Sequence, residues 1–165
     1  MAKNIYLSLG TNIGDRWKNL KTAVELLQKA KVKVINSSAV YETSPVGGGV
    51  QDNFYNMCLE IETDLVPELL LDTLKRIETE MGRTKGERNG PRIIDIDLLF
   101  YDNIIIIRAE LMLPHPRLWE RRFVLEPLAE IAGAFRHPVL NKTVKEMLGN
   151  GTFNEKVIYI GALDK

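Results

Sequence analysis

Apolar and polar residues alternate along several segments of the chain, and this period of two predicts β-strands with one buried face. In residues 4–10, for example, an isoleucine or leucine stands at every second position. Similar runs, rich in β-branched and aromatic residues, predict further strands at 31–43, 54–63, 93–101 and 156–163. The chain therefore has enough strand-forming segments to build a sheet.

Two longer segments replace the alternation with a period near 3.6, which predicts amphipathic helices. The first occupies residues 16–30 behind Asp15, a favourable N-cap, and carries a stripe of Trp17, Leu20, Val24 and Leu27. The second begins at Pro67 and ends at Gly82, and its stripe consists of Leu70, Leu74, Ile77 and Met81. Further helical segments are expected within 115–133 and 142–151.

The order of these elements is β-α-β-β-α-β, which is typical of a ferredoxin-like core in the α+β class. We expect an antiparallel sheet whose two helices pack on one face and leave the other face free for a site. The turn Asp102-Asn103 leads into a run of four isoleucines and predicts an added hairpin, followed by C-terminal helices. No linker divides the chain, so residues 1–165 are expected to form a single domain.

Composition narrows the class of protein. The chain has 165 residues, of which 45% are hydrophobic and 27% charged, as in an ordinary globular protein. Its net charge of zero argues against a dedicated nucleic-acid binder. The single cysteine, Cys58, excludes an internal disulfide and a cysteine-based zinc site. Neither a signal-peptide pattern nor a membrane-spanning segment is found, so a cytoplasmic location is expected.

Asp95 and Asp97 interrupt the apolar strand predicted at 93–101. Residues two apart on a strand point to the same face, so these carboxylates are expected roughly 6–7 Å apart. Their repulsion costs about 2–3 kcal/mol at an effective dielectric constant near 20. One explanation is an exposed strand face whose charges prevent aggregation. The other is a Mg²⁺ site, because Mg²⁺ prefers one or two carboxylates together with water and phosphate oxygens.

Basic residues dominate the segment from Arg83 to Arg92, which also contains Lys85 and Arg88. Ten residues are long for a connection between a helix and a strand, and long loops are often functional. The segment is either a solvated basic loop or a clamp that holds polyphosphate beside the two carboxylates.

The glycine-rich segment 44–53 matches neither a Walker loop nor a dinucleotide-binding fingerprint, and we expect a mobile lid between two strands. Phe54 and Asn56 follow it on one strand face. An aromatic plane beside an amide suits a flat heterocycle, although ordinary packing explains the pair equally well. His115 stands between two prolines, which predicts an extended turn, and it has either a structural or a phosphate-binding role.

Four stretches together resemble the 6-hydroxymethyl-7,8-dihydropterin pyrophosphokinases of folate biosynthesis: IYLSLGTNIGDR, YETSPVGGG with FYN, GPRIIDIDLLFY, and LPHPRL with RRFVLEPL. The similarity extends from Ile5 to Leu128 in the same order and with fitting spacing. It implies a Mg²⁺-dependent enzyme that transfers diphosphate from ATP to the hydroxymethyl group of the pterin and releases AMP. Three departures from the family pattern, at Ser44, Asn89 and Glu110, bear on loop closure and phosphate contacts.

The resemblance assigns roles to individual residues. It implies that Asp95 and Asp97 hold two Mg²⁺ ions and that Arg83 and Arg92 act with them in catalysis by binding ATP phosphates. Further ATP contacts are implied for Glu78, Lys85, Arg88, His115 and Arg121. The pterin is expected to contact Thr43, Ser44 and Val46 through their backbone, Asn56 through its amide, and the rings of Phe54 and Phe123.

Two other functions fit parts of the sequence. A ferredoxin-like module that binds RNA or a regulatory nucleotide without catalysis is disfavoured, because the strands lack paired aromatic residues and two aspartates repel phosphate. An ordinary kinase that leaves ADP differs from a pyrophosphokinase only in the phosphorus attacked, which the family resemblance decides. The expected partners are the small molecules ATP and hydroxymethyldihydropterin, with no nucleic acid, no membrane and no obligate protein partner.

Overall fold

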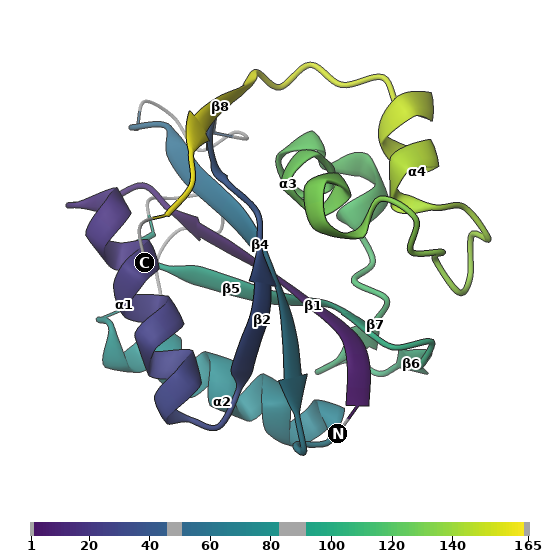
Figure 1. The fold of residues 1–165 in the computed structure, drawn as a ribbon, viewed down its shortest axis with the longest axis horizontal. Helices are drawn as coiled ribbons and strands as arrows, with labels where there is room; N and C mark the ends of the chain where they lie inside the picture. The colour runs from purple at the N-terminus through teal and green to yellow at the C-terminus, as the bar shows by residue number, and fades with distance from the viewer. Residues whose placement is uncertain (1, 46–50, 83–91, 164–165) are drawn as a thin grey trace.

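The computed structural model describes residues 2–45, 51–82 and 92–163, which form an antiparallel sheet with helices on both faces (Figure 1). The strands are β1 (Ala2–Thr11), β2 (Lys33–Ser37), β3 (Val40–Thr43), β4 (Phe54–Thr63), β5 (Asp95–Tyr101), β6 (Ile106–Ile107), β7 (Met112–Leu113) and β8 (Val157–Gly161). The helices are α1 (Arg16–Lys29), α2 (Pro67–Glu80), α3 (Arg122–Ala132), α4 (Val144–Asn150) and a short 3-10 turn, η1 (Leu118–Glu120).

The large sheet has the strand order β5-β1-β4-β3-β8, and β2 also pairs with β4. All of its strand pairs are antiparallel. When β2 and β3 are counted as one interrupted strand, the order of elements up to β5 matches a ferredoxin-like core. The predicted α+β class, with an antiparallel sheet and packed helices, is confirmed.

The strand predicted at 31–43 is interrupted because side chains take over its backbone hydrogen bonds. The backbone N–H of Cys58 donates to the hydroxyl oxygen of Ser38 at 2.9 Å. The N–H of Ala39 donates to both carboxylate oxygens of Glu130 on α3, each at 3.1 Å. The ladder therefore stops at Ser37 and resumes at Val40.

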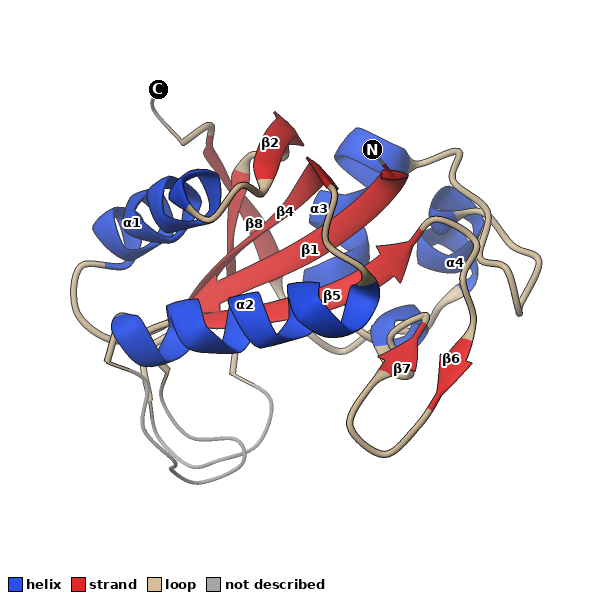
Figure 2. Ribbon diagram, turned by 90° about the horizontal axis from the view of Figure 1, so that it is seen from below, coloured by secondary structure: helices blue, strands red, loops and turns tan. Residues whose placement is uncertain are grey.

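Two hydrophobic cores lie on opposite faces of the sheet. Helices α1 and α2 cover one face, whereas α3 and α4 cover the other (Figure 2). The second core joins Tyr6, Cys58 and Phe100 of the sheet to Leu125 and its neighbours on α3. The prediction that the helices leave this face free is therefore wrong. Toward the end of β1 and the start of β5, Ser8, Asp95 and Asp97 occupy this face in place of apolar core residues.

The predicted hairpin between β5 and the isoleucine run is also wrong. The run departs from the sheet after Asp102, whose φ of 53° is left-handed, and β6 pairs with β7 in a separate two-stranded sheet. The outer edge of β5 is already engaged, since the N–H of Ile96 donates to Glu78 and the carbonyl of Leu99 accepts from the N–H of His115. These two bonds occupy positions along β5 that a hairpin partner would need.

The C-terminal segment forms the strand predicted there. A connection from α4 passes over α3 and reaches the sheet, where β8 lies beside β3 (Figure 1). Thr143 and Glu146 form a capping box at the start of α4. Within the described residues, none of the helices is both long and apolar enough to cross a membrane.

Candidate active site

Asp95 and Asp97 lie at the start of β5 and face the same side of the sheet, as predicted. In the register of the neighbouring strands, Asp95 lies opposite Gly10 and Asp97 opposite Ser8 of β1. The intervening Ile96 points into the first core and is 4% exposed, whereas both aspartates are only partly buried. The carboxylates therefore project from the face of the sheet that carries α3.

Further site residues lie on the other side of Gly10. This glycine pairs with Asn56 of β4 as well as with Asp95 of β5. The side-chain amide of Asn56 donates to the hydroxyl of Thr43 at 2.5 Å, and both side chains are buried. A Cβ atom on Gly10 would lie 2.7 Å from Oδ1 of Asn56 and 3.6 Å from Cδ1 of Phe54. Glycine is therefore required for Asn56 and Phe54 to lie close against the sheet.

Arg121 and His115 approach the aspartates from the α3 side of the sheet. Burial lowers the pKa of Arg121, and the nearby carboxylates of Asp97 and Asp95 oppose that shift. Burial and the charge of Arg121 lower the pKa of His115 to about 4, against the opposing effect of Asp95. Arg121 and His115, both singled out in the sequence, thus lie within electrostatic range of the carboxylate pair.

The protonation of His115 follows from its surroundings. Its Nδ1 atom accepts a hydrogen bond from the backbone N–H of Arg117 at 3.2 Å. With a pKa of about 4 the ring is neutral at pH 7, so the single ring proton resides on Nε2. His115 lies in the turn between β7 and η1, as its flanking prolines predicted, and can offer a hydrogen-bond donor to an anion.

Phe123 lies in the first turn of α3, next to Arg121. The guanidinium carbon of Arg121 is 5.5 Å from the centroid of the Phe123 ring, which is partly buried against the second core. Phe123 therefore comes from a helix and Phe54 from the sheet. Their arrangement around a common ligand stays a prediction.

Glu78 has a position that its sequence context did not indicate. It is buried between α2 and β5, and one carboxylate oxygen accepts the N–H of Ile96 at 2.7 Å. Because Ile96 separates the two aspartates, this bond fixes the backbone from which both carboxylates project. The ATP contact implied for Glu78 is not tested by this arrangement and stays a prediction.

Asn12 is a residue of the site to which the sequence analysis gave no role. It is 3% exposed, and its side-chain oxygen accepts the N–H of Arg92 at 2.7 Å. Its side-chain nitrogen donates to Oε1 of Gln51 at 2.8 Å and to the carbonyl of Asp52 at 2.9 Å. A single buried amide thus joins the chain just before Phe54 to the chain just before Asp95.

Comparison with known proteins identifies the family of the chain. The model of the 7,8-dihydro-6-hydroxymethylpterin-pyrophosphokinase family matches residues 6–133, most of the chain. A 2-amino-4-hydroxy-6-hydroxymethyldihydropteridine pyrophosphokinase of Bacillus subtilis is 50% identical over 127 residues, which cover 76% of each protein. The chain belongs to this pyrophosphokinase family.

Other relatives are longer proteins. The folic acid synthesis protein FOL1 of Dictyostelium discoideum is 44% identical over 143 residues, covering 87% of this chain but 22% of that protein. A crystal structure of Plasmodium falciparum HPPK-DHPS superposes on 90% of this chain and covers 45% of its own longer chain in doing so, with a TM-score of 0.75 and 20% identity. The chain therefore spans about a fifth of FOL1, and the structural likeness supports the fold.

The comparisons confirm the predicted family and the predicted class of enzyme. They leave the individual site residues untested, and four of those lie outside the described residues: Arg83, Lys85, Arg88 and Val46. Within the described part of the chain, no cluster of three or more His, Cys, Asp and Glu side chains could hold a metal ion. A cation at Asp95 and Asp97 would thus complete its shell with water and substrate oxygens, which fits Mg²⁺.

Proposed function

We propose that the chain transfers the diphosphate group of ATP to the hydroxymethyl group of 6-hydroxymethyl-7,8-dihydropterin, with Mg²⁺ held at Asp95 and Asp97. The observation that carries this proposal is the row Asn56, Gly10 and Asp95 across three neighbouring strands. Two strand spacings separate the amide from the carboxylate, roughly 10 Å. That span suits a pterin ring at Asn56 whose hydroxymethyl group points toward phosphates at the aspartates.

The heterocycle end of the site provides shape and hydrogen bonds. Phe54 supplies an aromatic plane beside Asn56, and Phe123 would lie on the opposite side of the ring. Asn56 is held in one orientation by Thr43, so its amide presents a fixed edge to the ligand. Backbone groups of Thr43 and Ser44 complete the proposed pterin contacts.

The phosphate end provides positive charge against a highly anionic substrate. Mg²⁺, when bound, would neutralise phosphate oxygens and draw them toward the aspartates. Arg121 and Arg92 are proposed to bind further phosphate oxygens, and His115 to donate from Nε2. Arg83, Lys85 and Arg88 belong to the same proposal as additional phosphate contacts.

In the reaction, the hydroxymethyl oxygen forms a bond to the β-phosphorus of ATP while the bond from that phosphorus to the α–β bridging oxygen breaks. AMP leaves with the bridging oxygen, and the alcohol proton passes to solvent. The neutral His115 is a poor base at a pKa of about 4, so we assign it to charge stabilisation and not to proton removal. Catalysis then depends on placement and charge neutralisation.

The remaining elements of the proposal come from the sequence. Residues 1–165 are taken as one domain that acts on small molecules, without nucleic acid, membrane or an obligate protein partner. A cytoplasmic location is likewise part of the proposal.

Phosphorus NMR of the chain with ATP, Mg²⁺ and hydroxymethyldihydropterin tests the reaction. The expected products are AMP and a pterin diphosphate ester. ADP with a pterin monophosphate would contradict the assigned phosphorus, and unchanged ATP with folded protein would favour a binding module. Asp97→Asn should reduce turnover by orders of magnitude, whereas Asp72→Asn, on the exposed side of α2, should leave it unchanged.

A further inference from the structure

The C-terminal segment 155–161 lies beyond the residues 6–133 that the family model matches. Even so, it contacts two parts of the proposed pterin pocket that are about eighty residues apart in sequence, namely the start of α3 and the end of β3. We infer that this segment is a positioning element that fixes Phe123 and the backbone at Thr43 and Ser44 for pterin binding. The inference rests on the proposed function of the pocket.

Glu155 caps the start of α3, where the helix has no capping side chain of its own. The N-cap residue of this helix is Arg121, and its side chain makes no capping hydrogen bond. The first N–H groups of a helix have no partner within the helix, and carboxylates bind them favourably. One carboxylate oxygen of Glu155 accepts the N–H of Phe123 at 3.3 Å, and the guanidinium of Arg122 donates to the Glu155 carbonyl at 3.3 Å.

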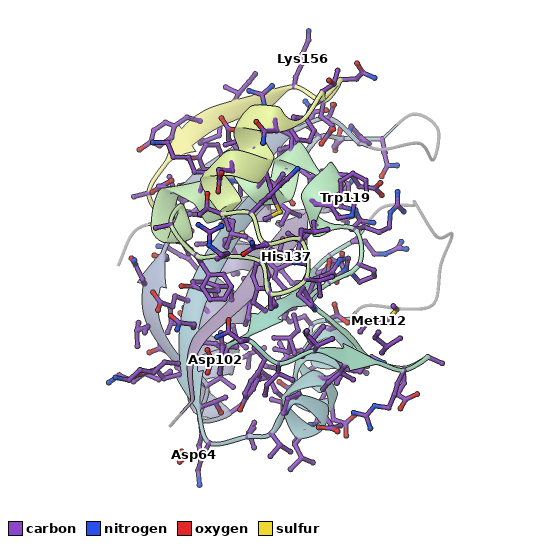
Figure 3. All side chains as sticks on the ribbon, turned by 90° about the vertical axis from the view of Figure 1, so that its right-hand side faces the viewer. Asp64, Asp102, Met112, Trp119, His137 and Lys156 are labelled. Atoms are coloured by element: carbon purple, nitrogen blue, oxygen red, sulfur yellow. The ribbon has the colours of Figure 1, made fainter. Side chains whose placement is uncertain are left out.

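The next residues of the segment attach to β3. The N–H of Ser44 donates to the carbonyl of Lys156 at 3.4 Å, and Val157 pairs with Thr43 in the ladder. Tyr159 contacts Tyr41 edge to face, with ring centroids 5.7 Å apart. The side chain of Lys156 points away from the molecule, so this residue acts through its backbone (Figure 3).

These contacts converge on one side of the site. Phe123 and Thr43 belong to the pterin end, whereas Asp95 and Asp97 lie on β5, at the opposite edge of the sheet from β8. Loss of the segment should therefore weaken pterin binding more than ATP binding. A residue that only stabilised the fold would affect both substrates alike.

The test compares Glu155→Ala with Glu155→Gln and with Glu25→Ala, a substitution of an exposed glutamate on α1. Glu155→Ala should raise the KM for the pterin about three- to tenfold, as expected for loss of a helix cap, and leave the KM for ATP within twofold. Glu155→Gln keeps a carbonyl oxygen that can accept the Phe123 N–H and should restore most of the affinity. Equal changes in both KM values, or an unchanged pterin KM, would overturn the inference.

Amide hydrogen exchange provides a readout that does not depend on turnover. Exchange in the first turn of α3 should accelerate in Glu155→Ala and remain unchanged in Glu25→Ala and in Glu155→Gln. Unchanged exchange in Glu155→Ala would refute the positioning contact even in an inactive protein. Turnover of the unsubstituted chain separately decides whether the proposed function holds.

Discussion

Gly10 offers a direct test of the proposed pterin pocket, because a single methyl group added there changes one contact. Gly10 lies in a regular part of β1 between Asn56 and Asp95, so alanine meets no backbone penalty in this position. The added Cβ would lie 2.7 Å from Oδ1 of Asn56. Either the amide or the strand must move by about 0.7 Å or more to reach an ordinary contact distance.

The movement is costly because Asn56 is already held from its other end. Its amide donates to the buried hydroxyl of Thr43, and a shift that breaks this bond leaves buried polar groups unsatisfied. Such a loss costs about 1–3 kcal/mol. We therefore expect Gly10→Ala to lower the free energy of unfolding by this amount and to raise the KM for the pterin about ten- to hundredfold, since 1.4 kcal/mol corresponds to a factor of ten.

Urea unfolding and steady-state kinetics with each substrate varied in turn measure the two effects. Gly149→Ala is the matched control, because a Cβ at Gly149 in α4 meets no atom within 4 Å and alanine favours a helix. The control should retain both KM values and equal or exceed the stability of the unsubstituted chain. A wild-type pterin KM in folded Gly10→Ala would refute the placement of the pterin against Asn56.

Three further predictions concern other buried groups. Asn12→Asp keeps an acceptor for the N–H of Arg92 but loses the hydrogen bonds donated to Gln51 and Asp52, so kcat should fall at least about tenfold. Asn12→Ala should lower kcat further, and an unchanged kcat in Asn12→Asp would contradict this role. Burial lowers the pKa of His137 below 6.5, so as the pH falls the unfolded chain binds a proton at this residue before the folded chain does. The free energy of unfolding should therefore decrease below pH 6.5, by at most about 1.4 kcal/mol per pH unit from this residue. Urea titrations from pH 7.5 to 5 should show a smaller decrease in the free energy of unfolding for His137→Asn. Burial raises the pKa of the Cys58 thiol, which is fully buried, so iodoacetamide at pH 8 should label the protein only in denaturant; rapid labelling of native protein would refute the burial.

The elements that the sequence predicts best are those in which local pattern and tertiary packing agree. Helix α1 begins after Asp15, whose side chain accepts the N–H of Lys18, and α2 begins at Pro67. Strand β4 occupies the predicted residues 54–63 because its two faces pack into two different cores. The predicted direction of the Asp95 and Asp97 side chains is likewise a consequence of the strand period alone.

The interruption at Ser38 and the role of Asn12 could not be predicted in this way. Both depend on partners distant in sequence: Glu130 for the backbone at Ala39, and Gln51 and Arg92 for Asn12. Serine and asparagine are also common turn residues, so their presence between predicted elements indicates a turn whatever else they bind. The cap that Glu155 gives to α3 has no local signal for the same reason.

Strand β5 shows how one irregularity serves both the core and the site. Its register with β1 shifts between Tyr6 and Leu7, where Leu99 is the extra residue of a bulge. A regular strand that pointed Asp95 and Asp97 toward the site would turn Phe100 to the opposite face. The extra residue resets the alternation, so that Phe100 joins the second core opposite Tyr6 while both aspartates keep their direction.

The same bulge accounts for the position of His115. An extra residue leaves a backbone group outside the ladder, and the carbonyl of Leu99 accepts the N–H of His115 at 2.9 Å. That bond attaches the turn after β7 to the strand that carries the aspartates. The neutral ring is then held within electrostatic range of Asp95 and Arg121. The apolar run from Leu98 to Tyr101 thus encodes more than a buried strand, because its one extra residue, Leu99, holds the phosphate-binding histidine of the proposal near the carboxylate pair.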